Sequence, residues 1–152
     1  MTRCLLPPSG MLDGTTHRYP LRVYFEDTDL TGVVYHANYL RWFERARTEL
    51  LRLLGIEQRG THEGGEGAYA VAELSIRYLS PARLDDEILI ESRAVELRAA
   101  SCRLAQRALR GDSVLAEAQL RVGFVGPDGK PRRQPPQWRE AFAQLMDEQG
   151  TT

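Results

Sequence analysis

Two carboxylates and an imidazole lie close together in a short segment with the sequence EDTDLTGVVYHAN. Asp27 and Asp29 precede Gly32, and His36 stands directly before a helical pattern that begins at Ala37. A carboxylate can attack an electrophilic carbon or take a proton from water. The unpaired N–H groups of a first helical turn can hold a developing oxyanion. The segment therefore predicts a site in which an acidic side chain lies near a helix N-terminus.

The segments on either side of these residues position them. Residues 17–25 have the alternation of a strand. Residues 37–54 predict a helix that ends at Gly55, because apolar side chains recur at helical spacing. Trp42 and Phe43 are read as core side chains. The side chains at this spacing are Leu40, Phe43, Arg47, Leu50, Leu51 and Leu54. The predicted solvated face consists mostly of Glu44, Arg45, Arg47, Glu49 and Arg52.

The rest of the chain reads mainly as strands. Residues 58–67 are rich in glycine and charge, which predicts a mobile loop. A short helix is expected over residues 138–146. One long helix followed by consecutive strands predicts an α+β domain, in which an antiparallel sheet packs against the helix. The strands are expected over residues 69–79, 86–97, 101–109 and 114–125.

Two sequence blocks carry a family resemblance. The segment EDTDLTGVVYHANYLRWFERARTELL resembles the signature of the YbgC-like branch of hotdog-fold acyl-CoA thioesterases, within the 4-hydroxybenzoyl-CoA thioesterase family. The resemblance resumes at IRYLSPARLDDEILI, over residues 76–90. It implies a hotdog fold, with an antiparallel sheet of about five strands wrapped around one long central helix. We expect a flexible leader over 1–16, the thioesterase domain over 17–136 and a tail with a short helix over 137–152.

The resemblance also implies an activity, the hydrolysis of acyl-CoA to a free acid and coenzyme A. Asp29 matches the acidic residue that either attacks the thioester carbonyl or activates water. The N–H of His36, or one beside it, is expected to polarise the thioester oxygen, and its imidazole to orient water or substrate. Val34 and Tyr35 are expected to contact the acyl group, and Asn38 to bind substrate or to cap the helix.

Structural interpretations of the same residues remain open. Asp29 also fits a residue that only caps a turn, and His36 fits a histidine packed at a helix start. Asp27 is assigned to loop geometry and local electrostatics. Asp27, Asp29 and His36 together are suitable metal ligands, but no second histidine stands nearby in the sequence, so we expect no metal. No redox cofactor is expected, because coenzyme A is part of the substrate.

Composition and charge limit the expected partners. Among the 152 residues the formal net charge is −1, which gives no field that would attract nucleic acid or an anionic membrane. Cys4 and Cys102 are too few for a disulfide framework, so we expect a cytoplasmic protein. The apolar run at the N-terminus is too short for a signal peptide. The candidate cations for the coenzyme A phosphates are Arg83, Arg98, Arg103, Arg132 and Arg133.

The resemblance finally implies an assembly and a competing function. Hotdog relatives pair edge strands, so we expect a homodimer or homotetramer with each active site at a subunit boundary. Acyl carrier protein is a second expected partner. The alternative function is that of a noncatalytic protein that binds acyl carrier protein or the Tol-Pal envelope system. Hydrolysis of a thioester by the purified protein distinguishes the enzyme from this alternative.

Overall fold

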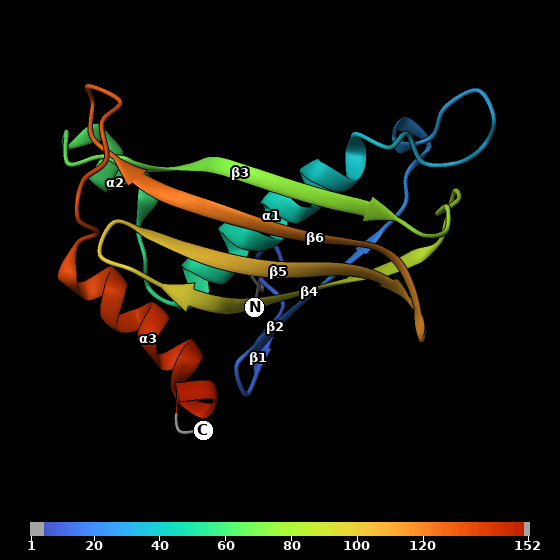
Figure 1. The fold of residues 1–152 in the computed structure, drawn as a ribbon. Coiled ribbons are helices and arrows are strands. Elements are labelled where there is room, and N and C mark those ends of the chain that lie inside the picture. The colour runs from blue at the N-terminus through green and yellow to red at the C-terminus, as the bar shows by residue number, and fades with distance from the viewer. Residues whose placement is uncertain (1–4, 151–152) are drawn as a thin grey trace, which may run out of the picture.

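The computed structural model describes residues 5–150, and the side chains of residues 5–146. Within this range one antiparallel sheet holds six strands in the order β1-β2-β4-β5-β6-β3 (Figure 1). The strands are β1 Met11–Asp13, β2 Thr16–Arg22, β3 Ala68–Tyr78, β4 Glu87–Leu97, β5 Ser101–Arg110 and β6 Ser113–Val125.

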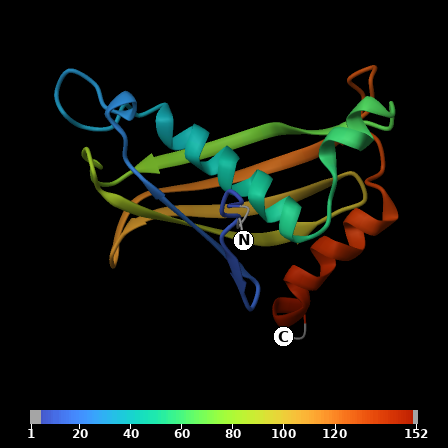
Figure 2. The ribbon, with the colours of Figure 1, turned by 180° about the vertical axis from the view of Figure 1, so that it is seen from behind.

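The helices lie together on one face of this sheet. The long helix α1 (Asn38–Leu53) runs across the sheet, and α3 (Pro136–Gly150) flanks its far end (Figure 2). Helix α1 ends where predicted, because Gly55 adopts a φ of +78°. A 3-10 turn, η1 (Phe25–Asp27), precedes α1, and the short helix α2 (Gln58–Glu63) follows it.

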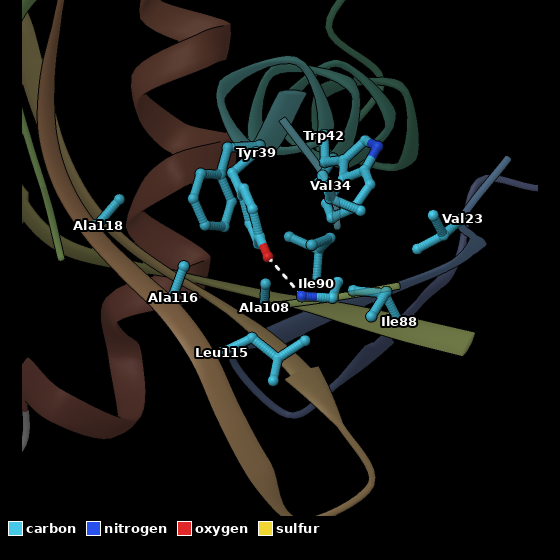
Figure 3. Close-up of a cluster of buried hydrophobic side chains, with 13 residues drawn as sticks. Val23, Val34, Tyr39, Trp42, Ile88, Ile90, Ala108, Leu115, Ala116 and Ala118 are labelled. Carbon is cyan, nitrogen blue, oxygen red and sulfur yellow. Dashed lines mark hydrogen bonds between the residues drawn. The ribbon is translucent and has the colours of Figure 1, made fainter. Parts of the chain in front are cut away.

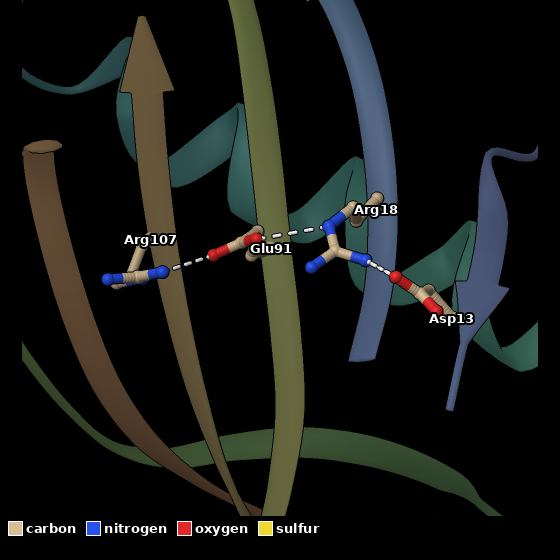
Figure 4. Close-up of polar contacts among 4 residues, drawn as sticks. All are labelled: Asp13, Arg18, Glu91 and Arg107. Carbon is tan, nitrogen blue, oxygen red and sulfur yellow. Dashed lines mark hydrogen bonds and ion pairs between the residues drawn. The ribbon is translucent and has the colours of Figure 1, made fainter. Parts of the chain in front are cut away.

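The strands alternate between a buried inner face and a charged outer face. On the outer face Asp13 pairs with Arg18, which pairs with Glu91, which in turn pairs with Arg107 (Figure 4). Burial alone would raise the pKa of Glu91, but the hydrogen bonds and charges of the two arginines together lower it. This row links β1, β2, β4 and β5 across the sheet.

The inner face packs against α1. Tyr39 and Trp42 of the helix contact a buried cluster contributed by the strands and by the segment before the helix (Figure 3). The buried hydroxyl of Tyr39 accepts a hydrogen bond from the backbone N–H of Ala82, at 3.0 Å. Trp138 and Phe142 of α3 close a second cluster at the other end of the sheet. The core therefore consists of two buried clusters, one packed against the first half of α1 and the other against its second half.

Most predicted elements are confirmed. The α+β class, the helix between Ala37 and Leu54 and the four strands after it agree with the structure to within one or two residues. Trp42 and Phe43 are buried in the core, as expected. The predicted terminal helix begins earlier, at Pro136, and packs into the second cluster as part of the domain. Leu40 does not share the buried stripe, because Tyr39 takes that place on the helix.

Three local predictions were wrong. The first strand ends at Arg22, because the Asp27 carboxylate accepts a hydrogen bond from the N–H of Tyr24 and bends the chain into η1. The segment predicted as a mobile loop contains α2, which follows the buried side chain of Ile56. Strand β1 lies within the expected flexible leader, since residues 11–13 pair with β2. The strand count therefore exceeds the expected five.

Strand β3 differs from the other long strands in its exposure. It pairs with β6 alone and forms an edge of the described sheet. Residues 70–75 are exposed on both faces. Leu74 lies opposite Leu120 of the buried face, yet its side chain is 38% exposed, and Tyr78 on the same strand is 44% exposed. Thus a long edge with an uncovered apolar side lies next to α1.

Candidate active site

The segment between β2 and α1 is held by a set of backbone hydrogen bonds. The N–H of Asp29 bonds to the carbonyl of Val33 at 2.8 Å, which closes a tight turn. The N–H of Tyr35 bonds to the carbonyl of Asp27 at 2.9 Å. The N–H of Val34 bonds to the carbonyl of Ala82 at 2.8 Å, which ties the turn to the β3–β4 connection. The residues predicted to do chemistry therefore lie on one braced loop, hereafter the Asp29 loop (residues 24–37).

Asp29 lies exposed at the turn of this loop. Its carboxylate accepts hydrogen bonds from the hydroxyl of Thr31 at 2.6 Å and from the N–H of Thr31 at 2.8 Å. These hydrogen bonds lower the pKa of Asp29, so the group is ionised near neutral pH. Asp29 does act as a turn former in this chain, as the structural interpretation predicted. Both hydrogen bonds from Thr31 end on the same carboxylate oxygen, Oδ1.

Asp27 and Asn38 hold the loop against the helix. The Asp27 carboxylate accepts a hydrogen bond from the N–H of Tyr24 at 2.8 Å, which agrees with the role in loop geometry expected for this residue. The side-chain N–H of Asn38 donates to the backbone carbonyl of Asp27 at 2.8 Å. Ala37 is the N-cap of α1, and none of the described side chains caps it, so of the two roles expected for Asn38 the cap is excluded, and contact with substrate stays a prediction. Asn38 is buried and ties the loop to the helix instead.

His36 lies between aromatic side chains that come from two parts of the chain, the loop itself and β3. Its ring centroid is 4.6 Å from that of Tyr35 and 6.1 Å from that of Tyr78. The hydroxyl of Tyr78 donates to the backbone carbonyl of His36 at 2.8 Å. Tyr39 contacts Tyr78 from the other side, at 5.4 Å. The edge strand β3 thus fixes the start of α1 through a residue that the sequence reasoning missed.

The start of α1 offers unpaired donors. Within residues 5–150, the backbone N–H groups of His36 and Ala37 have no hydrogen-bond acceptor. The N–H of Asn38 bonds to the carbonyl of Tyr35 at 2.9 Å and is therefore occupied. Because the helix dipole places partial positive charge at this end, the two free N–H groups can stabilise an anion. No hydrogen bond links Asp29 to His36 in the described part of the chain. The two residues are therefore positioned independently of each other.

The sequence that contains this loop matches a known family. Residues 23–145 match the Thioesterase-like superfamily. The chain belongs to this superfamily. It is 44% identical over 107 residues to the acyl-CoA thioesterase YbgC of Haemophilus influenzae, covering 70% of this chain and 79% of that protein. It is 40% identical over 126 residues to the acyl-CoA thioester hydrolase YbgC of Escherichia coli O6:H1, covering 82% and 93%.

Solved structures agree with the sequence comparison. A probable thioesterase from Bartonella henselae is 38% identical, with a TM-score of 0.75, and the similarity covers 79% of this chain and 99% of that one. A 1,4-dihydroxy-2-naphthoyl-CoA thioesterase from Synechocystis is 25% identical, with a TM-score of 0.79, over 84% and 96%. The predicted resemblance and the hotdog fold are therefore confirmed.

The remaining predicted site residues of this thioesterase occupy different surroundings. Tyr35 is exposed beside His36. Val34 is only 5% exposed and packs in the core near Trp42, so in the single chain it supports the loop (Figure 3). Its expected contact with the acyl group stays a prediction. Of the arginines considered for the coenzyme A phosphates, Arg98 and Arg103 pair with Glu96.

The described residues form neither a metal site nor a membrane-spanning helix. No group of three or more histidine, cysteine, aspartate or glutamate side chains is arranged to hold a metal ion in the part of the chain that was described. Among the same residues, no helix is long and apolar enough to cross a membrane. Cys102 is a buried strand residue, as expected, and burial raises the pKa of its thiol to about 12.

Proposed function

We propose that the protein hydrolyses acyl-CoA thioesters at the Asp29 loop, with Asp29 as the acting carboxylate and the start of α1 as the oxyanion site. The observation that carries this proposal is the ionised, exposed Asp29 carboxylate on a loop that is hydrogen-bonded to the first turn of α1. An acyl carrier protein carries the same thioester bond and is a second substrate form. The products are a free acid and a thiol.

The hydrogen bonds of Asp29 suit it for the reaction. Thr31 holds one carboxylate oxygen, which leaves the other free to act on a carbonyl carbon or on a water molecule. The lowered pKa keeps the group negatively charged at neutral pH, which both roles require. Because Asp29 is already ionised, it can act as nucleophile or as base without first giving a proton to the imidazole of His36.

The start of α1 supplies the complementary charge. In the tetrahedral intermediate the thioester oxygen becomes an oxyanion, which the free N–H groups of His36 and Ala37 can bind. Each well-placed donor of this kind contributes about 3 kcal/mol to the stability of the transition state. The hydrogen bond from Tyr78 to the His36 carbonyl fixes the orientation of the peptide that carries the Ala37 N–H.

The exposed edge of β3 supports an assembly of two or more chains. An edge strand of this length presents unpaired backbone groups, and native proteins cover such edges. Two copies related by a two-fold axis would pair β3 with β3 and cover the apolar side chains at Val71, Leu74 and Tyr78. We infer a homodimer formed through β3, alone or as half of a tetramer. Such a dimer also brings further side chains next to the exposed Asp29.

The catalytic assignment is tested by Asp29→Asn. We expect the variant to keep its fold and to lose more than about a hundredfold in kcat/KM on acyl-CoA, since the amide is neither a base nor a nucleophile. The matched control is Asp128→Asn, because Asp128 accepts a hydrogen bond from the N–H two residues later, as Asp29 does. Turnover of Asp29→Asn within a few-fold of wild type would exclude Asp29 from the chemistry. Absence of thioester hydrolysis in the wild type would favour the noncatalytic alternative.

The assembly is tested by Leu74→Glu. This change places a charge on the apolar side of the inferred β3 interface, so we expect light scattering to give the 17.2 kDa monomer and activity to fall with it. Val95→Glu is the matched control, because Val95 is 39% exposed on β4, away from that edge. A wild-type monomer with full activity would contradict both the dimer and the shared site.

A further inference from the structure

A hollow lies on the inner face of the sheet, away from the Asp29 loop. It has a volume of about 320 Å³, at the low end of the range of small-molecule sites. Its floor is apolar and consists of Leu104, Val122 and Phe142 from β5, β6 and α3. Its rim is polar and carries Glu44 and Arg47 of α1. A ligand that fills it therefore needs an apolar body and a polar end.

Arg47 is fixed in this hollow by a buried amide. The Nη1 group of Arg47 donates to Oε1 of Gln106 at 3.0 Å. The Nε2 group of Gln106 donates at 2.9 Å to both the Phe43 carbonyl and the Ser92 hydroxyl, so its oxygen is turned toward Arg47. The sequence reasoning placed Arg47 on a solvated face, and this was wrong, because its side chain lies partly buried over the sheet.

The guanidinium of Arg47 has no carboxylate partner. Burial lowers the pKa of Arg47, and the nearby charge of Glu44 only partly offsets this effect. No ion pair joins Arg47 to any carboxylate among the described side chains, whereas most arginines of the outer sheet face have one. A partly desolvated guanidinium with free N–H groups favours a planar, two-oxygen anion.

The hollow adjoins the edge strand β3, through which we infer that two copies of the chain pair. Tyr69 and Val71, at the N-terminal end of β3, form part of its wall. The other end of β3 lies near the loop that precedes α1 (Figure 1). Tyr78 at that end donates its hydroxyl hydrogen bond to the carbonyl of His36 in the Asp29 loop. Two copies that pair β3 about a two-fold axis do so antiparallel. We infer the register in which the axis lies at the middle of β3, between Glu73 and Leu74, so that Tyr78 of one copy lies beside Tyr69 of the other. In this register the Asp29 loop of one copy lies near the hollow of the other.

We propose that this hollow receives the acyl group of a thioester held at the Asp29 loop of the second copy, and that Arg47 selects acyl groups that end in a carboxylate. The inference rests on the proposed thioesterase function and on the β3 dimer. The apolar floor contacts the methylene chain, and the guanidinium binds the terminal carboxylate. Glu44, exposed on the same rim, weakens this preference because it carries the same charge as the ligand.

The selectivity is tested with thioesters of equal length. Octanoyl-CoA is compared with suberyl-CoA, which has the same eight-carbon chain and a terminal carboxylate. We expect kcat/KM for suberyl-CoA to exceed that for octanoyl-CoA by about tenfold or more, the effect of one charge-assisted contact. Arg47→Met should bring this ratio near or below one, and Glu44→Gln should raise it. The matched control, Arg45→Met, changes an exposed arginine of the same helix and should leave the ratio unchanged.

A binding experiment separates this inference from the function on which it rests. Calorimetry with Asp29→Asn measures the affinity for the two thioesters without turnover. We expect the same preference for suberyl-CoA, and its loss in Asp29→Asn combined with Arg47→Met. Equal affinities that do not respond to Arg47→Met would overturn the inference, even if hydrolysis is observed. Failure of wild type to hydrolyse any thioester would overturn the proposed function, while the affinity ratio would still decide the role of Arg47.

Hybrid dimers test whether two copies share the site. In a dimer of wild type with the double variant Asp29→Asn, Arg47→Met, the one remaining Asp29 faces the hollow that lacks Arg47, so the preference should disappear. In a dimer of Asp29→Asn with Arg47→Met, the remaining Asp29 faces the intact hollow, so the preference should persist. The reverse pattern would show that each hollow serves its own chain and would overturn the shared arrangement.

Discussion

Replacing Tyr39 by phenylalanine removes one buried hydrogen bond and almost nothing else. The Tyr39 ring is 2% exposed, and its hydroxyl accepts the N–H of Ala82 at 3.0 Å (Figure 3). Tyr39→Phe leaves that buried N–H without an acceptor, which costs about 1–3 kcal/mol of unfolding free energy. For a domain of this size a loss of 2 kcal/mol corresponds to a fall of about 4–8 °C in Tm. The Ala82 carbonyl holds the N–H of Val34, so the Asp29 loop should loosen as well.

Urea denaturation at one fixed protein concentration measures this loss, since assembly makes stability depend on concentration. Tyr19→Phe is the matched control, because Tyr19 packs on the same cluster and its hydroxyl makes no hydrogen bond within the described residues. We expect faster amide exchange at Ala82 and Val34 in Tyr39→Phe alone. Stabilities of the two variants within about 0.5 kcal/mol of each other would refute the reasoning.

Two further predictions concern pH and backbone space. Burial lowers the pKa of His17, so below the ordinary value of 6.5 the unfolded chain binds a proton that the folded chain does not. The free energy of unfolding should therefore fall as the pH drops from about 7 toward 5, by at most about 1.4 kcal/mol per pH unit. His17→Gln should lack this contribution to the pH dependence. Urea denaturation at several pH values that gives the same pH dependence for wild type and His17→Gln would contradict the prediction. Gly67→Ala places a Cβ 2.3 Å from the Val125 carbonyl at a φ of +143° and should cost more than about 3 kcal/mol. Gly65→Ala, at a φ of +80° with nothing within 4 Å, should cost about 1–2 kcal/mol in thermal unfolding, and similar losses at both glycines would argue against the clash.

The long elements were predictable because their signals are local. The helix α1 has an apolar stripe along its length and a glycine at its end, and both act within a few residues. Over most of their length the strands β4, β5 and β6 alternate between buried side chains and side chains that are half-buried or exposed, with turns between the strands. Such patterns need no knowledge of distant contacts.

The elements that were missed depend on contacts across the fold. Strand β1 exists because residues 11–13 pair with β2. Helix α2 follows Ile56, which is buried by residues from other parts of the chain. His17, the first residue of the predicted strand, is fully buried in β2, where its Nε2 lies 2.8 Å from the carbonyl of Ser9 in the expected flexible leader. None of these contacts leaves a periodic signal in the sequence.

The candidate site was predictable in its residue types and less so in its geometry. Asp29 and His36 were found from the loop sequence. The support from Tyr78 was not, because β3 meets the start of α1 only after the sheet has formed. Arg47 lies at helical spacing with the apolar residues of α1, and this spacing correctly indicates a side chain that faces the sheet. Its charge, however, favoured the interpretation that it lies on the solvated face of the helix. Only the buried amide of Gln106 explains why a charged side chain is held there.

The order of the strands has a consequence for synthesis of the chain. In the described sheet β3 pairs with β6 alone, and Ala68 pairs with Val125, so β3 leaves the ribosome well before its neighbour. At ordinary rates of translation the intervening residues take about 2–10 s to appear. During this time β3 has two open edges, and a strand in that state can pair with another nascent chain. Glu73 and Arg77, whose charges lie on β3, oppose such pairing until β6 arrives.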